Sequence, residues 1–280
     1  MIRRNEAKLT AVLVCLLGLS FSFAAHAAVV WSSSFETGSP GEFLDWDDPT
    51  HPFSADGTMP AGRVSAWTIV GTENGVSPTK GTHMYKGWIA GTQSDSHRAY
   101  PVLHVDVRTP VVNTFMVYLD ADYATMRPEE WIHFGTWGNA EEWAVFTMSV
   151  RDRHLVFAHA DPFEGEYIGP QPQATFPLRR WVRFTVYLQY EGSNGYAQVW
   201  QDGVPMLRAK LPQLGHAPGT NLQRAHWGMY ASGSISKAVQ YNDDIQICTL
   251  SAKLTDLVTE PTCGASTAKR PNPPTDLRVQ

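Results

Sequence analysis

Several features that common protein classes need are scarce in this sequence. Charged residues make up 18% of the 280-residue chain, against about a quarter in an average globular domain. Acidic residues outnumber basic ones by 27 to 22, which argues against the broad basic surface of a nucleic-acid-binding protein. After the N-terminus, no apolar run is long enough to cross a bilayer, so a polytopic membrane protein is excluded. No stretch keeps a helical period, and this excludes a largely helical fold.

The N-terminus has the pattern of a secretory signal. Three basic residues precede an apolar run from Leu9 to Phe23. This run is too short to span a membrane comfortably. Ala25-His26-Ala27 then gives the small-x-small cleavage pattern. We therefore predict a signal peptide at residues 1–27. The mature protein is expected to be secreted, periplasmic or extracellular, without a membrane span.

Cysteine is scarce as well. The chain has three cysteines, and signal cleavage removes Cys15. The remaining two, Cys248 and Cys263, are close in sequence, which in an oxidising compartment predicts one disulfide. This bond would pin the C-terminal segment to the last strand. Two cysteines without histidines at ligand spacing are too few for a zinc site.

Aromatic residues, in contrast, are abundant. Ten Trp, ten Tyr and twelve Phe, with 22 Gly and 19 Pro, favour strands and turns. Alternating apolar and polar runs predict strands at residues 113–120, 131–137, 145–151, 154–160, 181–190, 196–201, 204–210, 225–232 and 241–250. Asp202-Gly203 is a strong two-residue hairpin signal. Many short strands of this kind predict an all-β sandwich or barrel at residues 28–254, followed by a Pro- and Thr-rich tail at residues 255–280.

Four segments carry a resemblance to a known fold. They are SFETG at 34–38, GTHMYKG at 81–87, the strand and hairpin at 181–206, and AHWGMYASG at 225–233. In this order they resemble the concanavalin A-like superfamily of lectins, glucanases, laminin-G-like modules and polysaccharide lyases. The resemblance covers most of residues 31–250 and implies a two-sheet antiparallel jelly-roll sandwich. This fold hosts both binders and enzymes, so the resemblance implies the fold more than the function.

Two places resemble the alginate and heparin lyases of that superfamily. Those enzymes have a histidine on a middle strand and a tyrosine just after a Gly-x pair on a late strand. WIHFG and HWGMY supply His133 and Tyr230 at these positions. The chain departs from their pattern at Trp131, where glutamine is usual, and at Trp227, where lysine is common. Their arginine-rich early strand is represented by Arg98, so the resemblance implies catalytic roles for His133, Tyr230 and Arg98.

Strand alternation predicts that these residues share a surface. Trp131, His133 and Trp137 fall on one face of their strand, and His226 and Tyr230 fall on one face of theirs. If both strands lie in the concave sheet, the side chains form a platform of aromatic and imidazole rings that suits sugar rings. The predicted substrate contacts are Trp131, Trp137, His226 and Tyr100.

The predicted chemistry is β-elimination on a uronic-acid polymer. A lyase must neutralise the uronate carboxylate, remove the C5 proton and protonate the leaving oxygen. Arg98 is the candidate for the first task, and Tyr230 and His133 are candidates for the proton transfers, which are worth ~10²–10⁴-fold. We favour this function narrowly. The alternative is a non-catalytic lectin-like or laminin-G-like carbohydrate-binding module, and the net charge of -5 does not favour an anionic substrate unless the groove is locally basic.

A structural calcium ion is a further expectation from the resemblance. Many jelly rolls of this kind hold Ca²⁺ with an early Glu and a late Asp, and Glu36 and Asp243 or Asp244 resemble these positions. Carboxylates together with loop carbonyls supply the oxygen ligands that calcium requires. We expect no organic cofactor and a polysaccharide as partner, and the sequence specifies no oligomeric state.

Overall fold

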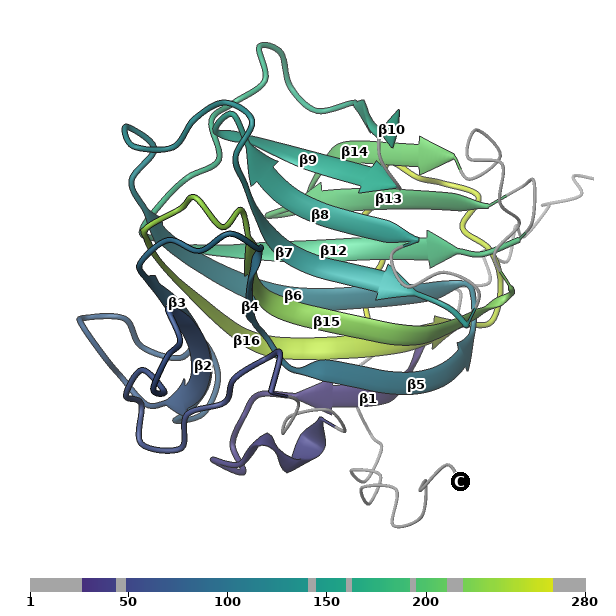
Figure 1. Ribbon diagram of the computed structural model, residues 1–280. Helices are drawn as coiled ribbons and strands as arrows, with labels where there is room; N and C mark the ends of the chain where they lie inside the picture. The colour runs from purple at the N-terminus through teal and green to yellow at the C-terminus, as the bar shows by residue number, and fades with distance from the viewer. Residues whose placement is uncertain are drawn as a thin grey trace, which may run out of the picture.

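The computed structural model describes residues 27–43, 49–140, 145–159, 163–191, 195–210 and 219–263, and shows two antiparallel β-sheets packed face to face (Figure 1). Apart from one 3-10 helix, η1 (Pro40–Glu42), the regular elements of these ranges are strands. No helix in the described ranges has the length and apolarity that a membrane crossing requires. The predicted all-β jelly-roll sandwich is confirmed. Residues 1–26 of the predicted signal peptide (1–27) and residues 264–280 of the predicted tail (255–280) lie outside the described residues.

The larger sheet has nine strands. In spatial order they are β11 (Glu166–Tyr167), β14 (Val204–Lys210), β13 (Tyr196–Gln201), β12 (Trp181–Gln189), β6 (Val111–Ala121), β16 (Lys237–Leu250), β3 (Met84–Ala90) and β2 (Ser65–Val70), with β1 (Ala27–Ser33) paired to the second half of β16. The predicted hairpin joins β13 and β14. Asp202 and Gly203 both have positive φ, 49° and 85°, as the turn of a two-residue hairpin requires.

The smaller sheet has seven strands. In spatial order they are β10 (Phe163–Glu164), β9 (His154–His159), β8 (Phe146–Arg151), β7 (Trp131–Gly138), β15 (Asn221–Ala231) and β4 (His97–Ala99), with β5 (Val102–Arg108) paired to the first half of β15. In Figure 1 this sheet lies in front of the nine-stranded one. Its central strands, β7 and β15, carry the segments that the sequence connects with function.

The core lies between the sheets and follows from strand alternation. In β12, the alternate residues Val182, Phe184, Val186 and Leu188 are all fully buried against the opposite sheet, as the alternation predicts. The other face of β12 carries Tyr187. Tyr187 on that face is nevertheless only 1% exposed, because a further segment covers it.

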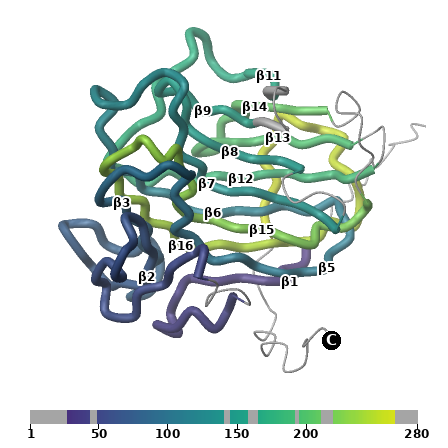
Figure 2. Tube along the Cα trace, in the orientation of Figure 1, coloured from purple at the N-terminus to yellow at the C-terminus, as the bar shows by residue number. Residues whose placement is uncertain are grey.

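That covering segment is residues 251–263, the C-terminal strap, which contacts β12 and β13 (Figure 2). Leu254 and Leu257 pack against a cluster that includes Tyr187 and Trp200. The Trp200 indole Nε1 donates to the Val258 carbonyl at 3.4 Å. The described part of the predicted tail therefore adds to the hydrophobic packing of the domain, although it has no strand or helix periodicity.

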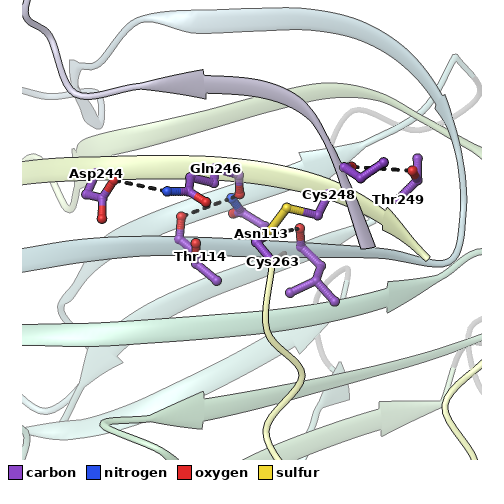
Figure 3. Close-up of a disulfide and its surroundings, with 9 residues drawn as sticks. Asn113, Thr114, Asp244, Gln246, Cys248, Thr249 and Cys263 are labelled. Carbon is purple, nitrogen blue, oxygen red and sulfur yellow. Dashed lines mark hydrogen bonds between the residues drawn. A yellow bond between two sulfur atoms is a disulfide. The ribbon is translucent and has the colours of Figure 1, made fainter. Parts of the chain in front are cut away.

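The strap ends at a covalent bond. Cys263 forms a disulfide with Cys248 near the end of β16, which confirms the predicted pairing. Figure 3 shows the bond beside Asn113 of β6, whose side-chain amide donates to the Gln246 carbonyl at 2.7 Å. The strap is thus fixed to the middle of the nine-stranded sheet.

Asn113 also joins the two sheets. Its side chain is fully buried, and its Oδ1 accepts hydrogen bonds from the indole Nε1 of Trp137 in β7, at 3.0 Å, and of Trp227 in β15, at 2.8 Å. Buried indole N–H groups need an acceptor. One side-chain amide of the nine-stranded sheet therefore accepts the buried indole N–H groups of two strands of the other sheet.

We predict that Asn113→Ala lowers the free energy of unfolding by roughly 2–5 kcal/mol, because two buried N–H donors lose their acceptor at about 1–3 kcal/mol each. Urea denaturation followed by tryptophan fluorescence measures this. The control is Asn221→Ala, which removes a bond to Asp106 at the sheet surface and should change stability by about 0.5 kcal/mol or less. A loss of under about 1 kcal/mol in the Asn113 variant would contradict the proposed bridge.

Candidate functional site

The three candidate catalytic residues are neighbours across the seven-stranded sheet. Arg98 of β4 pairs with Tyr230 of β15, and Tyr230 pairs with His133 of β7. Directly paired residues in antiparallel strands point to the same face. The rings of His133 and Tyr230 are 5.0 Å apart and nearly perpendicular, and the Arg98 guanidinium carbon lies 5.9 Å from the Tyr230 ring centroid. We call this set the Arg98–Tyr230–His133 row; all three residues are partly exposed.

Trp131 extends the row on its β7 side. It lies two residues before His133, so strand alternation places both side chains on the same face. Its ring centroid is 4.3 Å from that of His133 and 4.7 Å from that of Tyr230. The Trp131 backbone N–H donates to the Ser232 hydroxyl at 3.0 Å, which ties the start of β7 to the end of β15. The predicted proximity of Trp131, His133 and Tyr230 is therefore present in the fold.

Trp137 requires a correction. The sequence places it on the same face as His133, whereas the structure places it in the core, fully buried and bonded to Asn113. The cause is a register shift between His133 and Gly135, which adds one residue to β7 relative to β8 and inverts the alternation beyond it. Gly135 leaves room for the indole, since a Cβ there would lie 2.9 Å from the Trp137 ring. Trp137 is thus a core residue and not a surface contact.

His226 and Tyr100 lie on the expected side of the sheet, but both are buried. Their rings stack at 3.9 Å with an interplanar angle of 14°. Their exposed fractions are 1% and 3%, so an open contact with substrate, as predicted for both, is not available in this arrangement. His51 contributes to the cover, because its ring lies 4.5 Å from that of Tyr100.

The sequence did not reveal two members of this surface. His51 lies in the segment before β2, where no strand periodicity marks it. Ser149 of β8 pairs with His133 and so continues the row by one strand. To predict that Ser149 lies beside His133, one must know how β7 and β8 are paired. The bulge in β7 shifts this pairing by one residue.

Burial keeps the imidazoles of this site neutral. Desolvation lowers the pKa of His133 to about 3. Desolvation also lowers the pKa of His226 well below its ordinary value, and the nearby His133 and His51 lower it further. The Nδ1 atom of His133 is buried without a hydrogen-bond partner among the described residues. At neutral pH His133 is therefore an uncharged ring.

Arg98 supplies positive charge at the row. Within the described ranges, no carboxylate forms an ion pair with it, in contrast to Arg180 and Arg183 on the other sheet, which pair with Asp202 and Glu260. A guanidinium can bind a ligand carboxylate with two parallel hydrogen bonds. The row thus combines a cation, a phenol and a neutral imidazole, beside the indole of Trp131.

The predicted calcium ligands meet at a different place, the turn at residues 79–83. Glu36 accepts hydrogen bonds from the backbone N–H groups of Thr82 and His83, both at 2.8 Å. Asp243 is fully buried and accepts from the backbone N–H groups of Thr79, at 2.6 Å, and Lys80, at 2.8 Å. These bonds fix the turn from both sides.

Asp244 has a different partner, the Lys80 ammonium group, at 2.9 Å. Within the described residues, no three acidic, His or Cys side chains gather as a metal site. Loop carbonyls would have to supply the remaining ligands around Glu36 and Asp243. Calcium binding at this turn stays a prediction.

No family model matches the chain, and no curated protein matches it. Among solved structures, the chain is similar to "Cellulose induced protein, Cip1", with a TM-score of 0.54 and 13% identity over 78% of this chain and 96% of that one. With the observed strand order, this similarity supports the two-sheet antiparallel sandwich fold.

Two further solved structures are similar at lower TM-scores. Alginate lyase Aly36B has a TM-score of 0.40 and 13% identity, over 64% of this chain and 82% of that one. The botulinum neurotoxin serotype G binding domain has a TM-score of 0.41 and 11% identity, over 70% of this chain and 44% of that one. A shared fold does not specify a function, so the function must be argued from the site.

The neutral state of His133 generates a prediction about pH. Its folded pKa is about 3 and its unfolded pKa is about 6.5, so between these values the unfolded chain binds a proton that the folded protein does not. Stability should therefore fall as pH falls below about 6.5, by up to about 1.4 kcal/mol per pH unit from this group. His133→Gln should flatten the decline in unfolding free energy between pH 7.5 and 5. The value at pH 7.5 controls for packing, and an unchanged slope would contradict the prediction.

The calcium prediction has an independent test. If Ca²⁺ binds at the 79–83 turn, it should raise the Tm of EDTA-treated protein, because a ligand that binds only the folded state stabilises it. Asp243→Asn and Glu36→Gln should each remove most of this rise. Equal Tm values in calcium and in EDTA would show that the two carboxylates act only as hydrogen-bond acceptors for the turn.

Proposed function

We propose that the protein binds a uronic-acid polysaccharide on the outward face of the seven-stranded sheet and cleaves it by β-elimination. The observation that carries this proposal is the Arg98–Tyr230–His133 row. More than thirty residues separate each member from the next along the chain, yet strand pairing makes them adjacent on one face. A cation, a proton-transferring phenol and a neutral imidazole in line are what the elimination of a uronate requires.

Substrate binding is assigned to the row and to Trp131. The partly exposed Trp131 indole offers an apolar surface for a sugar ring, beside polar groups that can orient hydroxyls. Arg98 binds the uronate carboxylate, and in doing so makes the C5 proton more acidic. His226 and Tyr100, which are buried, support the surface from below.

The proton transfers are assigned to Tyr230. A base with a pKa of about 3, such as His133, is poorly matched to a carbon acid, since a catalytic pKa works best near the operating pH. Once its hydroxyl proton has passed to water, Tyr230 takes the proton from C5, the electron pair forms the C4–C5 double bond, and the C4–O4 bond breaks. The phenol then returns the proton to O4. His133 remains neutral and provides a hydrogen-bonding partner beside Tyr230.

The second candidate function is a non-catalytic carbohydrate-binding module. The ring contacts of Trp131 with His133 and Tyr230 favour it, because aromatic platforms suffice for binding sugars. The two functions differ in what they require of the Tyr230 hydroxyl. For either one, we propose action outside the cytoplasm, which the disulfide and the signal-like N-terminus support.

We predict that Tyr230→Phe keeps the fold and most of the polymer binding but lowers turnover by ~10²–10⁴-fold, because it removes only the proton-transferring oxygen. Turnover is measured as ultraviolet absorption of the unsaturated product across a panel of uronic-acid polymers. The control is Tyr196→Phe on the nine-stranded sheet, whose hydroxyl bonds to Gln198; it should keep wild-type turnover.

A different result would select the second function. If wild-type protein is retained on polymer affinity gels but no polymer in the panel yields an unsaturated product, the lyase proposal fails. In that case Trp131→Ala should weaken retention, whereas Tyr230→Phe should leave it nearly intact.

A further inference from the structure

One buried hydroxyl connects the nine-stranded sheet to the strands of the row. Tyr85 of β3 is fully buried, and its side chain crosses the interior of the sandwich. Its hydroxyl donates to the Ala99 carbonyl of β4 and accepts the Met229 backbone N–H of β15 at 2.9 Å. Ala99 and Met229 are paired residues of β4 and β15. A phenol from the opposite sheet therefore bridges the two strands at this pair.

Two glycines make room for this phenol. Gly228 of β15 has φ +126°, and a Cβ there would lie 2.5 Å from the Tyr85 hydroxyl oxygen. A Cβ on Gly87 of β3 would overlap the same oxygen. Larger residues at either position would displace the hydroxyl from the two backbone groups. Both sheets thus contribute a glycine to the space that the Tyr85 hydroxyl occupies.

The bridged residues are the direct neighbours of the row. Ala99 follows Arg98, and Met229 precedes Tyr230. β4 is three residues long, so few ladder bonds hold it against β15. The two bonds of one hydroxyl are therefore a large part of what fixes Arg98 relative to Tyr230.

We propose that Tyr85 is a positioning residue, whose hydroxyl sets the register and distance of Arg98 and Tyr230 from the interior of the sandwich. Its importance for turnover rests on the proposed function, whereas its role as a bridge does not. Burial raises the pKa of Tyr85, so the hydroxyl keeps its proton and remains a donor to Ala99. Small misplacements matter because a shift of about 1 Å can cost ~10²-fold in rate.

The test is Tyr85→Phe, which removes one oxygen, with Tyr187→Phe as matched control. Tyr187 is equally buried, and its hydroxyl bonds to Gln189 on the far side of the nine-stranded sheet. Both variants should melt lower. Only Tyr85→Phe should lower kcat, by about tenfold or more, while KM changes by about threefold or less, because binding through Trp131 persists.

Unchanged kcat in Tyr85→Phe, or an equal loss of kcat in Tyr187→Phe, would overturn the proposal. If Tyr85→Phe does not fold, Gly87→Ala replaces it, since the added methyl group displaces the hydroxyl while leaving it in the chain. The same selective loss of kcat is then expected, and wild-type kcat would overturn the proposal.

A second readout is independent of catalysis. Hydrogen exchange of the Met229 amide, followed by NMR, should be about tenfold faster in Tyr85→Phe than in wild-type protein and unchanged in Tyr187→Phe. Equal rates in all three proteins would overturn the bridge. A wild-type protein without turnover on any uronate polymer would contradict the proposed function alone, and amide exchange would still decide the role of Tyr85.

Discussion

The arrangement of the two sheets depends on the buried amide of Asn113. Two indoles from β7 and β15 donate to one oxygen on β6, so the central strands of the smaller sheet have a fixed position over the larger one. These same strands carry His133 and Tyr230. Hydrophobic packing is non-directional and would allow the sheets to slide over each other. The two hydrogen bonds to one oxygen are directional and do not allow this. The outer face of the smaller sheet is therefore positioned by polar contacts in the interior.

The outer faces of the two sheets have different roles. On the nine-stranded sheet, the C-terminal strap covers Tyr187 and Trp200, and the disulfide holds the strap in place. Another loop covers part of the same face, where the Trp181 indole donates to the Ser77 carbonyl at 3.0 Å. On the seven-stranded sheet, Trp131 and the row stay partly exposed. The aromatic residues thus stabilise the protein on one outer face, and on the other they form the proposed binding surface.

Alternation along single strands was a sufficient guide to much of this fold. It predicted the bounds of β13 and β14 and the common face of His133 and Tyr230, because these depend on period two alone. It failed at Trp137, because one extra residue in β7 inverts the period, and a bulge has no clear mark in a single sequence. The burial of His226 by Tyr100 and His51, and the bridge from Tyr85, depend on contacts between segments far apart in sequence. Periodicity carries no information about such contacts.

Two imidazoles, those of the partly exposed His133 and the buried His226, affect the stability of the fold at acid pH. His133 and His226 are held neutral by desolvation, so each one makes the folded protein less stable as the pH falls below its unfolded value. An aliphatic side chain at either position would avoid this cost. Arg98 lies two strands away from His133, across Tyr230, and supplies the positive charge of the row. The Asn113 bridge and the fixed strap stabilise the fold elsewhere and so offset this cost.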